Sequence, residues 1–167
     1  PIWNPLNRTP GQDIGRTTDE IVTDIQSFVS SGGWGDRLET ILRNIIFSMI
    51  LLPQATFLDI SDLLRNKAEE NEVLRREILK VVPNETVRQF WEHDYKNYGK
   101  DDLGPPKNKL SKLLVSDTVS LMLSQPESRF SFRRIMDEGI ILLVNLSALG
   151  SLKEIHGNFI VTFLYLN

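Results

Sequence analysis

An apolar stripe of helical periodicity runs through residues 36–51 and constrains the fold of this chain more than any other segment. Apolar residues recur at intervals of three and four, which places them on one face of an α-helix, while polar residues fill the opposite face. Pro53 follows closely, and a proline disfavours helical conformation in the residue before it. The segment therefore predicts a long helix whose buried face consists of Leu38, Ile41, Leu42, Ile45, Ile46 and Met49.

Capping signals mark the starts of shorter helices on either side. Thr17 is followed three residues later by Glu20, and Thr56 is followed by Asp59. Each pair predicts a capping box, in which the two side chains satisfy backbone N–H groups at the helix start. Asn84 is predicted to cap a further helix, because a short amide side chain accepts well at that position.

The second half of the helical region adds an aromatic stripe and a proline break. Aromatic and apolar residues between Val87 and Tyr98 recur at helical spacing and predict a buried face. Residues 101–106 end in two prolines and predict a polar turn, because proline interrupts helical hydrogen bonding. Residues 107–115 and 117–123 predict two last helices, so we expect an irregular, mainly α bundle of six or seven helices.

The pattern changes near the C-terminal end of the sequence. Residues 140–144 are five apolar residues in succession, which is typical of a strand covered on both faces. Asp137-Glu138-Gly139 predicts a turn before this strand, and residues 152–166 return to helical spacing. We therefore expect an extended lead-in (residues 1–16), a helical domain (17–128) and a strand–helix unit of another class (129–167).

The composition limits the classes of function. The 167 residues are enough to bury a core, and the formal net charge of −3 argues against a basic nucleic-acid binder as a whole. The absence of cysteine removes disulfides, thiolate nucleophiles and cysteine-rich zinc sites. No segment reads as a signal peptide or a membrane span, so we expect a cytoplasmic location. The chain does not begin with methionine and closes within an apolar run, which predicts a piece of a larger protein.

Motifs for catalysis and metal binding are missing from the sequence. His93 and His156 are far apart and lack ligand-spaced partners. Glu92 and Asp94 flank His93, but consecutive helical residues point in different directions. Neither a Gly-x-Ser-x-Gly elbow nor a GxxxxGK[ST] phosphate loop occurs. We predict no catalytic residue, no metal site and no nucleotide site within the chain.

Five basic residues are candidates for contact with DNA or a partner. Lys107, Lys109 and Lys112 are expected to cluster on one helix surface, where they would suit phosphate groups. Exposed helix faces normally carry lysine and arginine, so a solvated face is the more ordinary interpretation of this cluster, and DNA contact is the alternative. Arg133 and Arg134 precede the predicted strand and would contact a partner or pair with a nearby acid in residues 137–138.

Several short motifs occur in an order that resembles a known family. The block FRRIMDEG-IILLVNLS spans residues 132–147 and is preceded by NPL (4–6), WGDRLE (34–39), ILRN (41–44), TFLDI (56–60), VRQFW (87–91) and PES (126–128). Their order resembles conjugative-transfer ATPases, the type IV secretion coupling-protein-like members of the HerA–FtsK superfamily. One departure from that family is a short turn, residues 148–150, where the family has a longer turn containing lysine and glycine.

The resemblance implies a RecA-like ring ATPase that moves DNA or protein and carries an inserted all-α domain for recognition. The NPL motif would then be a short strand leaving the ATPase core, and residues 129–167 would return to it. ATP and magnesium would be bound by the parent protein, at the cytoplasmic face of the membrane, and not by this chain. Implied partners are the remainder of the parent ATPase and DNA or a DNA-processing complex, and the isolated chain is expected to self-associate. The alternatives are a free-standing helical interaction module and, less well supported by the pattern of residues, a small DNA-binding regulator.

Overall fold

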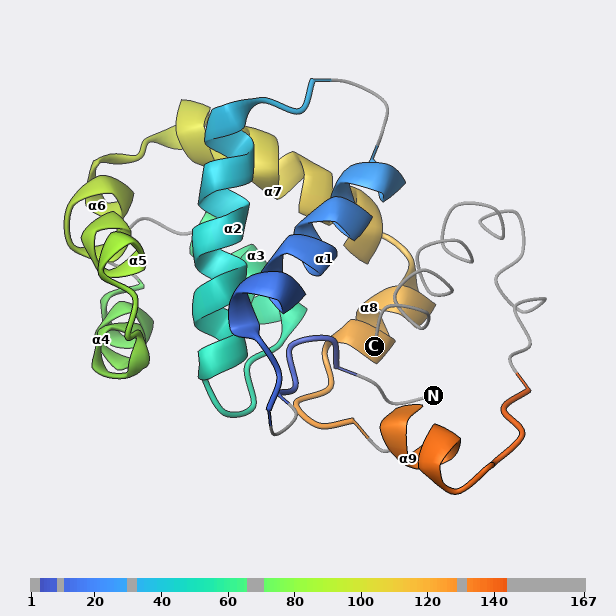
Figure 1. Cartoon of the computed structure of the whole chain (residues 1–167). Helices are drawn as coiled ribbons and strands as arrows, with labels where there is room; N and C mark the ends of the chain where they lie inside the picture. The colour runs from blue at the N-terminus through green and yellow to red at the C-terminus, as the bar shows by residue number, and fades with distance from the viewer. Residues whose placement is uncertain (1–3, 9–10, 30–32, 66–70, 129–131, 144–167) are drawn as a thin grey trace.

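The computed structural model describes residues 4–8, 11–29, 33–65, 71–128 and 132–143 (Figure 1). Within these ranges the chain is mainly helical and contains no strand, which confirms the predicted mainly α class. The helices pack as an irregular bundle around one hydrophobic core.

Helix α2, Asp36–Leu51, has the bounds that its apolar periodicity predicts. All six residues of the predicted face are buried, and Ile50 joins them. The helix packs against α1 (Ile14–Phe28), α3 (Phe57–Arg65), α4 (Glu72–Val81) and α7 (Lys100–Leu114). Removing this face from water is the main favourable term in forming the body of the domain.

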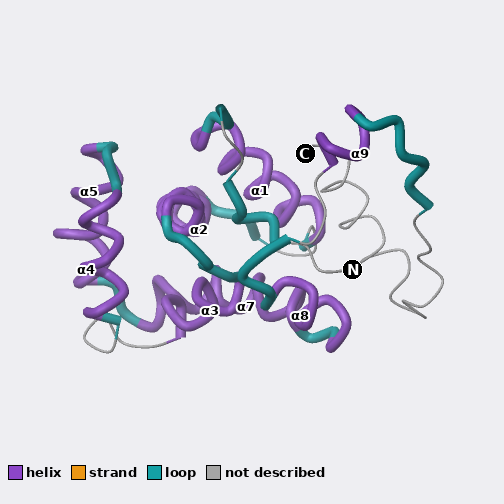
Figure 2. The backbone as a smooth tube through the Cα atoms, turned by 90° about the horizontal axis from the view of Figure 1, so that it is seen from below, coloured by secondary structure: helices purple, strands orange, loops and turns teal. Residues whose placement is uncertain are grey.

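The elements form a body and an attached helical hairpin. Figure 2 shows α3, α7 and α8 (Asp117–Leu123) along one side of the body, with α2 nearly end-on and α1 beyond it. The hairpin consists of α4 and a second arm that runs through α5 (Glu85–Gln89), the π-helix η1 (Phe90–Asp94) and α6 (Tyr95–Asn97). It lies at the opposite end of the body from α8 (Figure 2).

The start of α1 differs from the sequence prediction. The helix begins at Ile14, and the Asp13 carboxylate caps it by accepting from the Arg16 N–H at 3.1 Å. Thr17 is therefore inside the helix, where its hydroxyl donates to the Asp13 carbonyl, and Glu20 pairs with Arg16. The predicted capping box is wrong because Asp13 supplies an earlier and better acceptor, which adds a turn of helix.

Of the two other predicted caps, the Asn84 cap forms as predicted, whereas only half of the capping box of Thr56 and Asp59 forms. The Asp59 carboxylate accepts from both the N–H and the hydroxyl of Thr56, at 2.6 and 2.8 Å, at the start of α3. The side chain of Asn84 accepts from the Val87 N–H at 3.2 Å and begins α5. Such caps satisfy N–H groups that have no partner within the helix.

The predicted polar turn at residues 101–106 is wrong, because α7 begins at Lys100 and continues through Pro105 and Pro106. The Gly99 N–H donates to the Asp102 carboxylate at 2.9 Å and stabilises the helix start. Each proline lacks only the N–H that would reach a first-turn carbonyl, so the loss is confined to the helix end. Burial of Leu103 and Pro106 against the body offsets that loss.

The second arm of the hairpin buries the predicted aromatic stripe. Phe90, Trp91 and Tyr95 are fully enclosed, and their rings pack edge-to-face or tilted at 4.7 to 6.1 Å between centroids. The Trp91 indole N–H donates to the Ser48 hydroxyl at 2.8 Å, which joins the hairpin to α2. Burial raises the pKa of Tyr95 to about 12, so its phenol stays protonated and donates to the Leu63 carbonyl.

The apolar spacing of residues 71–82 predicts a helix with Val73, Leu74, Ile78 and Val81 on one face, and α4 departs from this prediction. Ile78 is buried, whereas Val73 is 77% exposed and Val81 is exposed as well. Arg75 takes the inward position instead, where its guanidinium pairs with Glu72 and donates to the Trp91 carbonyl at 3.3 Å. The periodicity missed this because a paired arginine fills the space that an apolar side chain would occupy.

The segment predicted as a strand carries no regular structure where it is described. A short helix, α9 (Phe132–Asp137), precedes it, and the turn after the helix contains Gly139, whose φ of +64° suits a glycine. This places a turn at residues 137–139, as predicted. Residues 140–143 are exposed and irregular, and a strand needs a neighbouring strand for its hydrogen bonds. Residue 144 and the predicted helix 152–166 lie outside the described residues.

Candidate functional site

Two segments from opposite ends of the helical domain meet beside the corner between α2 and α3. Residues 4–7 form a turn in which the Asn7 N–H donates to the Asn4 carbonyl at 3.0 Å. Residues 126–128 follow α8 and lie against this turn (Figure 1). We call these two segments together the neck. The short strand that the family resemblance implies for residues 4–6 is a turn in the structure.

Hydrogen bonds join the two segments of the neck directly. The Asn4 N–H donates to the Ser128 hydroxyl at 2.9 Å, across 124 positions of sequence. The Ser128 N–H donates to the Asn7 side chain at 2.6 Å, and the Asn7 amide donates back to the Pro126 carbonyl at 2.9 Å. This reciprocal pattern holds both segments in one relative position.

The corner between α2 and α3 is the third part of this junction. The Asn4 side-chain amide donates to the Ala55 carbonyl at 2.7 Å and to the Pro126 carbonyl at 3.2 Å. Gln54, immediately before Ala55, has a φ of +63°, in the left-handed region that non-glycine residues rarely adopt. A strained residue next to a buried polar contact marks a place where tertiary contacts determine the backbone conformation.

The structure does not bring the three candidate lysines of α7 together on one surface. Lys109 is only 9% exposed, Lys107 is half-buried and Lys112 is exposed. Lys107 and Lys109 are two residues apart, which separates them by about 200° around a helix of 3.6 residues per turn. Of the three, Lys112 alone is placed to meet a large partner without rearrangement.

The arginine pair lies in α9. Arg134 is exposed and its guanidinium pairs with the Glu138 carboxylate at 2.7 Å, which is the acid pairing that the sequence left open. The side chain of Arg133 lies outside the described part of the structure. An exposed i, i+4 pair stabilises a helix by only about 0.3–0.5 kcal/mol, so Arg134 can exchange this partner for another at little cost.

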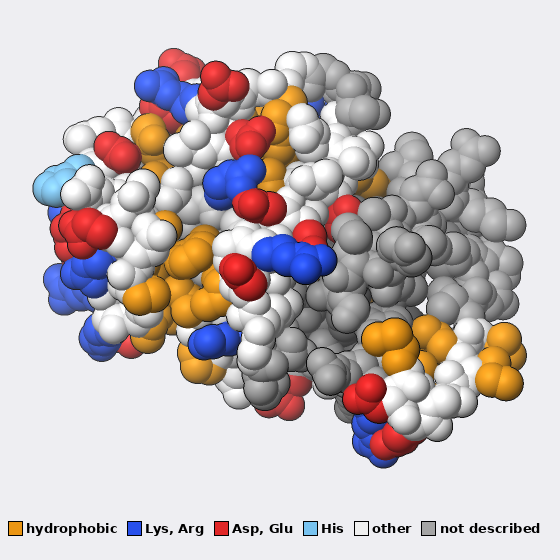
Figure 3. Space-filling view, in the orientation of Figure 1, with side chains coloured by type: hydrophobic (Ala, Val, Ile, Leu, Met, Phe, Trp, Pro, Cys, Tyr) orange, Lys and Arg blue, Asp and Glu red, His pale blue; other side chains and the backbone are white. Residues whose placement is uncertain are grey.

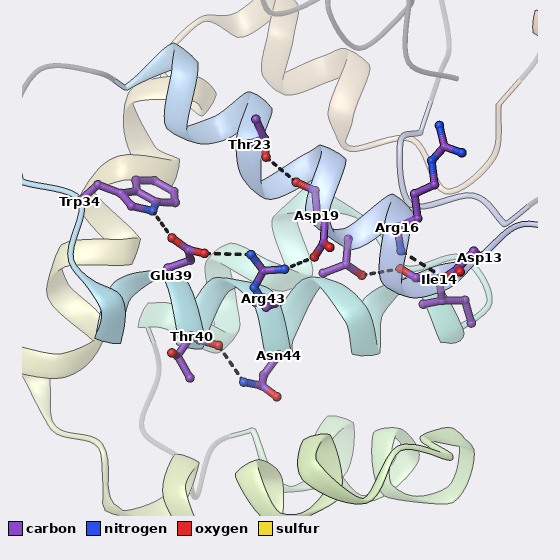
Figure 4. A network of polar contacts seen from close by, with 11 residues as sticks. Asp13, Ile14, Arg16, Asp19, Thr23, Trp34, Glu39, Thr40, Arg43 and Asn44 are labelled. Carbon is purple, nitrogen blue, oxygen red and sulfur yellow. Dashed lines mark hydrogen bonds and ion pairs between the residues drawn. The ribbon is translucent and has the colours of Figure 1, made fainter.

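A polar network crosses the interface between α1 and α2 (Figure 4). The Trp34 indole N–H donates to Glu39 at 2.8 Å, Glu39 accepts from Arg43 at 2.8 Å, and Arg43 also pairs with Asp19 of α1. Each charge in the network faces one of opposite sign, so the network aligns the two helices and leaves no group poised for acid or base chemistry.

Asp24 of α1 is the most perturbed carboxylate among the described residues. It is 4% exposed, and burial raises its pKa from 3.8 to about 6, with a further contribution from the negative charge of Glu20. Sequence periodicity could not identify it, because an acid at the edge of an apolar stripe is ordinarily solvated.

The described residues hold no group of three metal-ligating side chains, and His93 is exposed on the hairpin. His156 lies outside the described residues. None of the described helices combines the length and apolar character that crossing a bilayer requires.

An apolar segment follows α9 at the edge of the molecule (Figure 3). Ile141 and Leu143 are 85% and 89% exposed, and Ile140, Leu142 and Met136 are exposed as well. Acidic and basic side chains are interspersed over the rest of the face in Figure 3, without a large patch of one sign. A contiguous exposed apolar surface marks a site that another surface covers.

Comparisons of the chain with protein-family models, curated proteins and solved structures give no match. The candidate site is therefore defined by its own geometry. It consists of the neck, the adjoining corner between α2 and α3, and the apolar segment that leaves the neck through α9.

Proposed function

We propose that this chain carries the helical recognition domain of an ATP-driven DNA or protein translocase of the coupling-protein-like kind. In this proposal the domain, within residues 4–128, is inserted into the ATPase core and is not itself catalytic. Residues 129–167 then lead back into the core, which covers the apolar segment after α9.

The neck is the observation that carries the proposal. An inserted domain leaves its host and returns to it at neighbouring points, so its two connections lie side by side. The bond from the Asn4 N–H to Ser128, across 124 positions, brings the connections together in this way. The NPL and PES motifs that form the neck are also the motifs that the resemblance places next to the ATPase core.

The neighbouring coding sequence tests the parent protein. We expect a strand-GxxxxGK[ST]-helix segment upstream of residue 1 and an apolar strand ending in an acid downstream of residue 167. An open reading frame that closes directly on both sides of the chain, without these motifs, would contradict the insertion and favour a free-standing interaction module.

A nucleotide assay tests the absence of catalysis in the chain. The purified chain should neither retain ATP during gel filtration nor release phosphate above a buffer control, because it has no phosphate loop. Hydrolysis that co-purifies with the chain through successive columns would overturn this part of the proposal.

A salt titration tests DNA contact through α7. Binding of labelled single- and double-stranded DNA should weaken with salt, and Lys112→Ala should reduce the log–log slope by about one if this lysine contacts a phosphate. Lys80→Ala is the matched control, because Lys80 is exposed on α4 and pairs with Glu77. Equal slopes for wild type and Lys112→Ala would exclude this contact and direct the search to a protein substrate.

Sedimentation tests whether the apolar segment needs a cover. The isolated chain should self-associate as its concentration rises, and Ile141→Asp with Leu143→Asp should shift it toward monomer. Arg76→Asp, at an exposed position of α4, is a control for added negative charge. A wild-type chain that stays monomeric and binds no apolar dye would contradict the expectation.

A further inference from the structure

Asn4 is 1% exposed even though its side chain is an amide with both donors and an acceptor. The amide donates to the Ala55 and Pro126 carbonyls, and its oxygen accepts from the Leu6 N–H at 3.0 Å. One buried side chain therefore satisfies groups from three segments that are far apart in the sequence. Removing it would leave the buried Ala55 carbonyl without this donor, while the Pro126 carbonyl, at the surface, would keep the Asn7 amide.

We propose that Asn4 is a lock that makes both segments of the neck and the corner between α2 and α3 open and close as one unit. The two bonds donated by its amide are the link between the neck and this corner, since Ala55 accepts from Asn4 and Pro126 accepts from the same nitrogen. The Asn7 and Ser128 bonds then hold the two neck segments to each other.

The lock is joined to the far end of the domain through α2. This helix of 16 residues is about 24 Å long and starts at the end of the body opposite the neck. There Arg37 pairs with Asp102 and lies over the Tyr98 ring, 6.0 Å from its centroid. Because the inner face of α2 is fully buried, the helix moves as a rigid element, and a displacement of the neck reaches Arg37 through it.

The backbone strain at Gln54 favours opening of the junction when the neck is displaced. Its left-handed backbone, with a φ of +63°, is strained, and the strain persists only while the surrounding contacts hold it. Opening of the lock would release Gln54 to an ordinary conformation. The strain therefore favours the open arrangement and the Asn4 bonds favour the closed one, which is the balance that a two-state coupling element needs.

The inference concerns the helical domain itself and does not depend on the identity of the parent protein. If the proposed function holds, the two segments lead into the motor, and the lock sets how motion of the motor reaches the helical domain. Hydrogen exchange on the chain alone tests the lock, whereas the coding-sequence, nucleotide and DNA experiments test the proposed function, so either can fail without the other.

Amide hydrogen exchange on the full chain tests the lock. The informative amides are those of Ser128 and Ala55, because they donate to Asn7 and Leu52 and not to Asn4. Asn4→Ala should speed exchange at both by about tenfold or more, because the variant loses all three hydrogen bonds of the Asn4 side chain. The Ile45 amide, in the middle of α2, should keep its wild-type rate. Asn97→Ala is the matched control, since its exposed amide donates only to the His93 carbonyl.

Ser128→Ala provides a second variant that removes no buried amide. Ser128 contacts Asn4 and Asn7 but not Ala55, so faster exchange at Ala55 in this variant supports a single unit. Unchanged rates at both Ser128 and Ala55 in Asn4→Ala would overturn the lock. Equal acceleration at Ile45 would also overturn it, because Asn4 would then act only on global stability.

Discussion

The buried face of α2 is apolar apart from Ser48, whereas the neck is joined by amide, hydroxyl and carbonyl groups. The α2 face contacts α1, α3, α4 and α7 without needing any one directional bond. The neck depends on three polar side chains, those of Asn4, Asn7 and Ser128, whose bonds must all align. The apolar contacts of the first region are non-directional, while the hydrogen bonds of the second fix the relative orientation of its segments.

The two regions also differ in how far apart along the chain their partners lie. The α2 face is organised by residues three and four positions apart, while the neck joins residues 119 to 124 positions apart. Closing so long a loop costs conformational entropy, and the hydrogen bonds of the neck alone do not offset this cost. The apolar core must therefore form to hold the two segments near each other, and the neck then selects their orientation.

The largest expected effect comes from truncating the α2 face. Ile45→Ala should lower the free energy of unfolding by roughly 2–5 kcal/mol, because Ile45 is fully buried and a cavity remains. Urea denaturation measures the change, and Val73→Ala on exposed α4 is the control with almost no expected loss. A loss below that of Asn4→Ala would reverse the comparison between the two regions.

The pH dependence of stability tests the effect of burying the Asp24 carboxylate in α1. The folded pKa of Asp24 is about 6, above its ordinary value of 3.8, so the folded state holds the proton more tightly. Stability is then greatest below pH 3.8 as far as this group is concerned, and is lost as pH rises to about 6. Asp24→Asn should remove this dependence and raise the free energy of unfolding at pH 7 by up to about 3 kcal/mol.

Asp62→Asn is the control for Asp24→Asn, because Asp62 is an exposed acid on α3. Denaturation of both variants and wild type between pH 4 and 8 isolates the contribution of Asp24. Parallel curves for wild type and Asp24→Asn would show that ionisation of this carboxylate does not oppose folding.

An intermediate effect is expected from the hydrogen bond between Ser48 and Trp91, which lies within the apolar core. Ser48→Ala should cost about 1–3 kcal/mol, because the buried Trp91 indole N–H loses its acceptor. Ser27→Ala removes an exposed hydroxyl that bonds the carbonyl four residues earlier, as Ser48 also does, and serves as the control. Thermal and urea unfolding measure both, and equal losses would mean that the bond to Trp91 adds nothing.

The smallest expected effect lies at the corner beside the neck. Gln54→Gly should stabilise the domain by less than about 1 kcal/mol, because glycine adopts a positive φ without steric cost but loses more chain entropy on folding. Gln54→Ala keeps the Cβ atom, and therefore the backbone strain at positive φ, so it should not stabilise the domain. A destabilising Gln54→Gly would show that the glutamine side chain contributes more than its backbone strain removes.

Local patterns predicted the elements whose stability is local. The stripe of α2, the aromatic arm from Val87 to Tyr98 and the Asn84 cap follow from contacts within a few residues. The start of α1 and the passage of α7 through Pro105 were missed, since a competing acceptor and burial against the body decided them. The order of the motifs along the sequence singled out NPL and PES, but it did not predict that these two motifs contact each other.

The sequence by itself determined that this chain forms a helical domain, because helical periodicity expresses which side chains avoid water. Tertiary structure alone decided that Asn4 meets Ser128, that Lys109 is buried and that Asp24 has lost its solvent. These outcomes depend on which surfaces come together after the helices have formed. No spacing along the chain encodes them, since burial and directional bonding between distant residues are properties of the packed molecule.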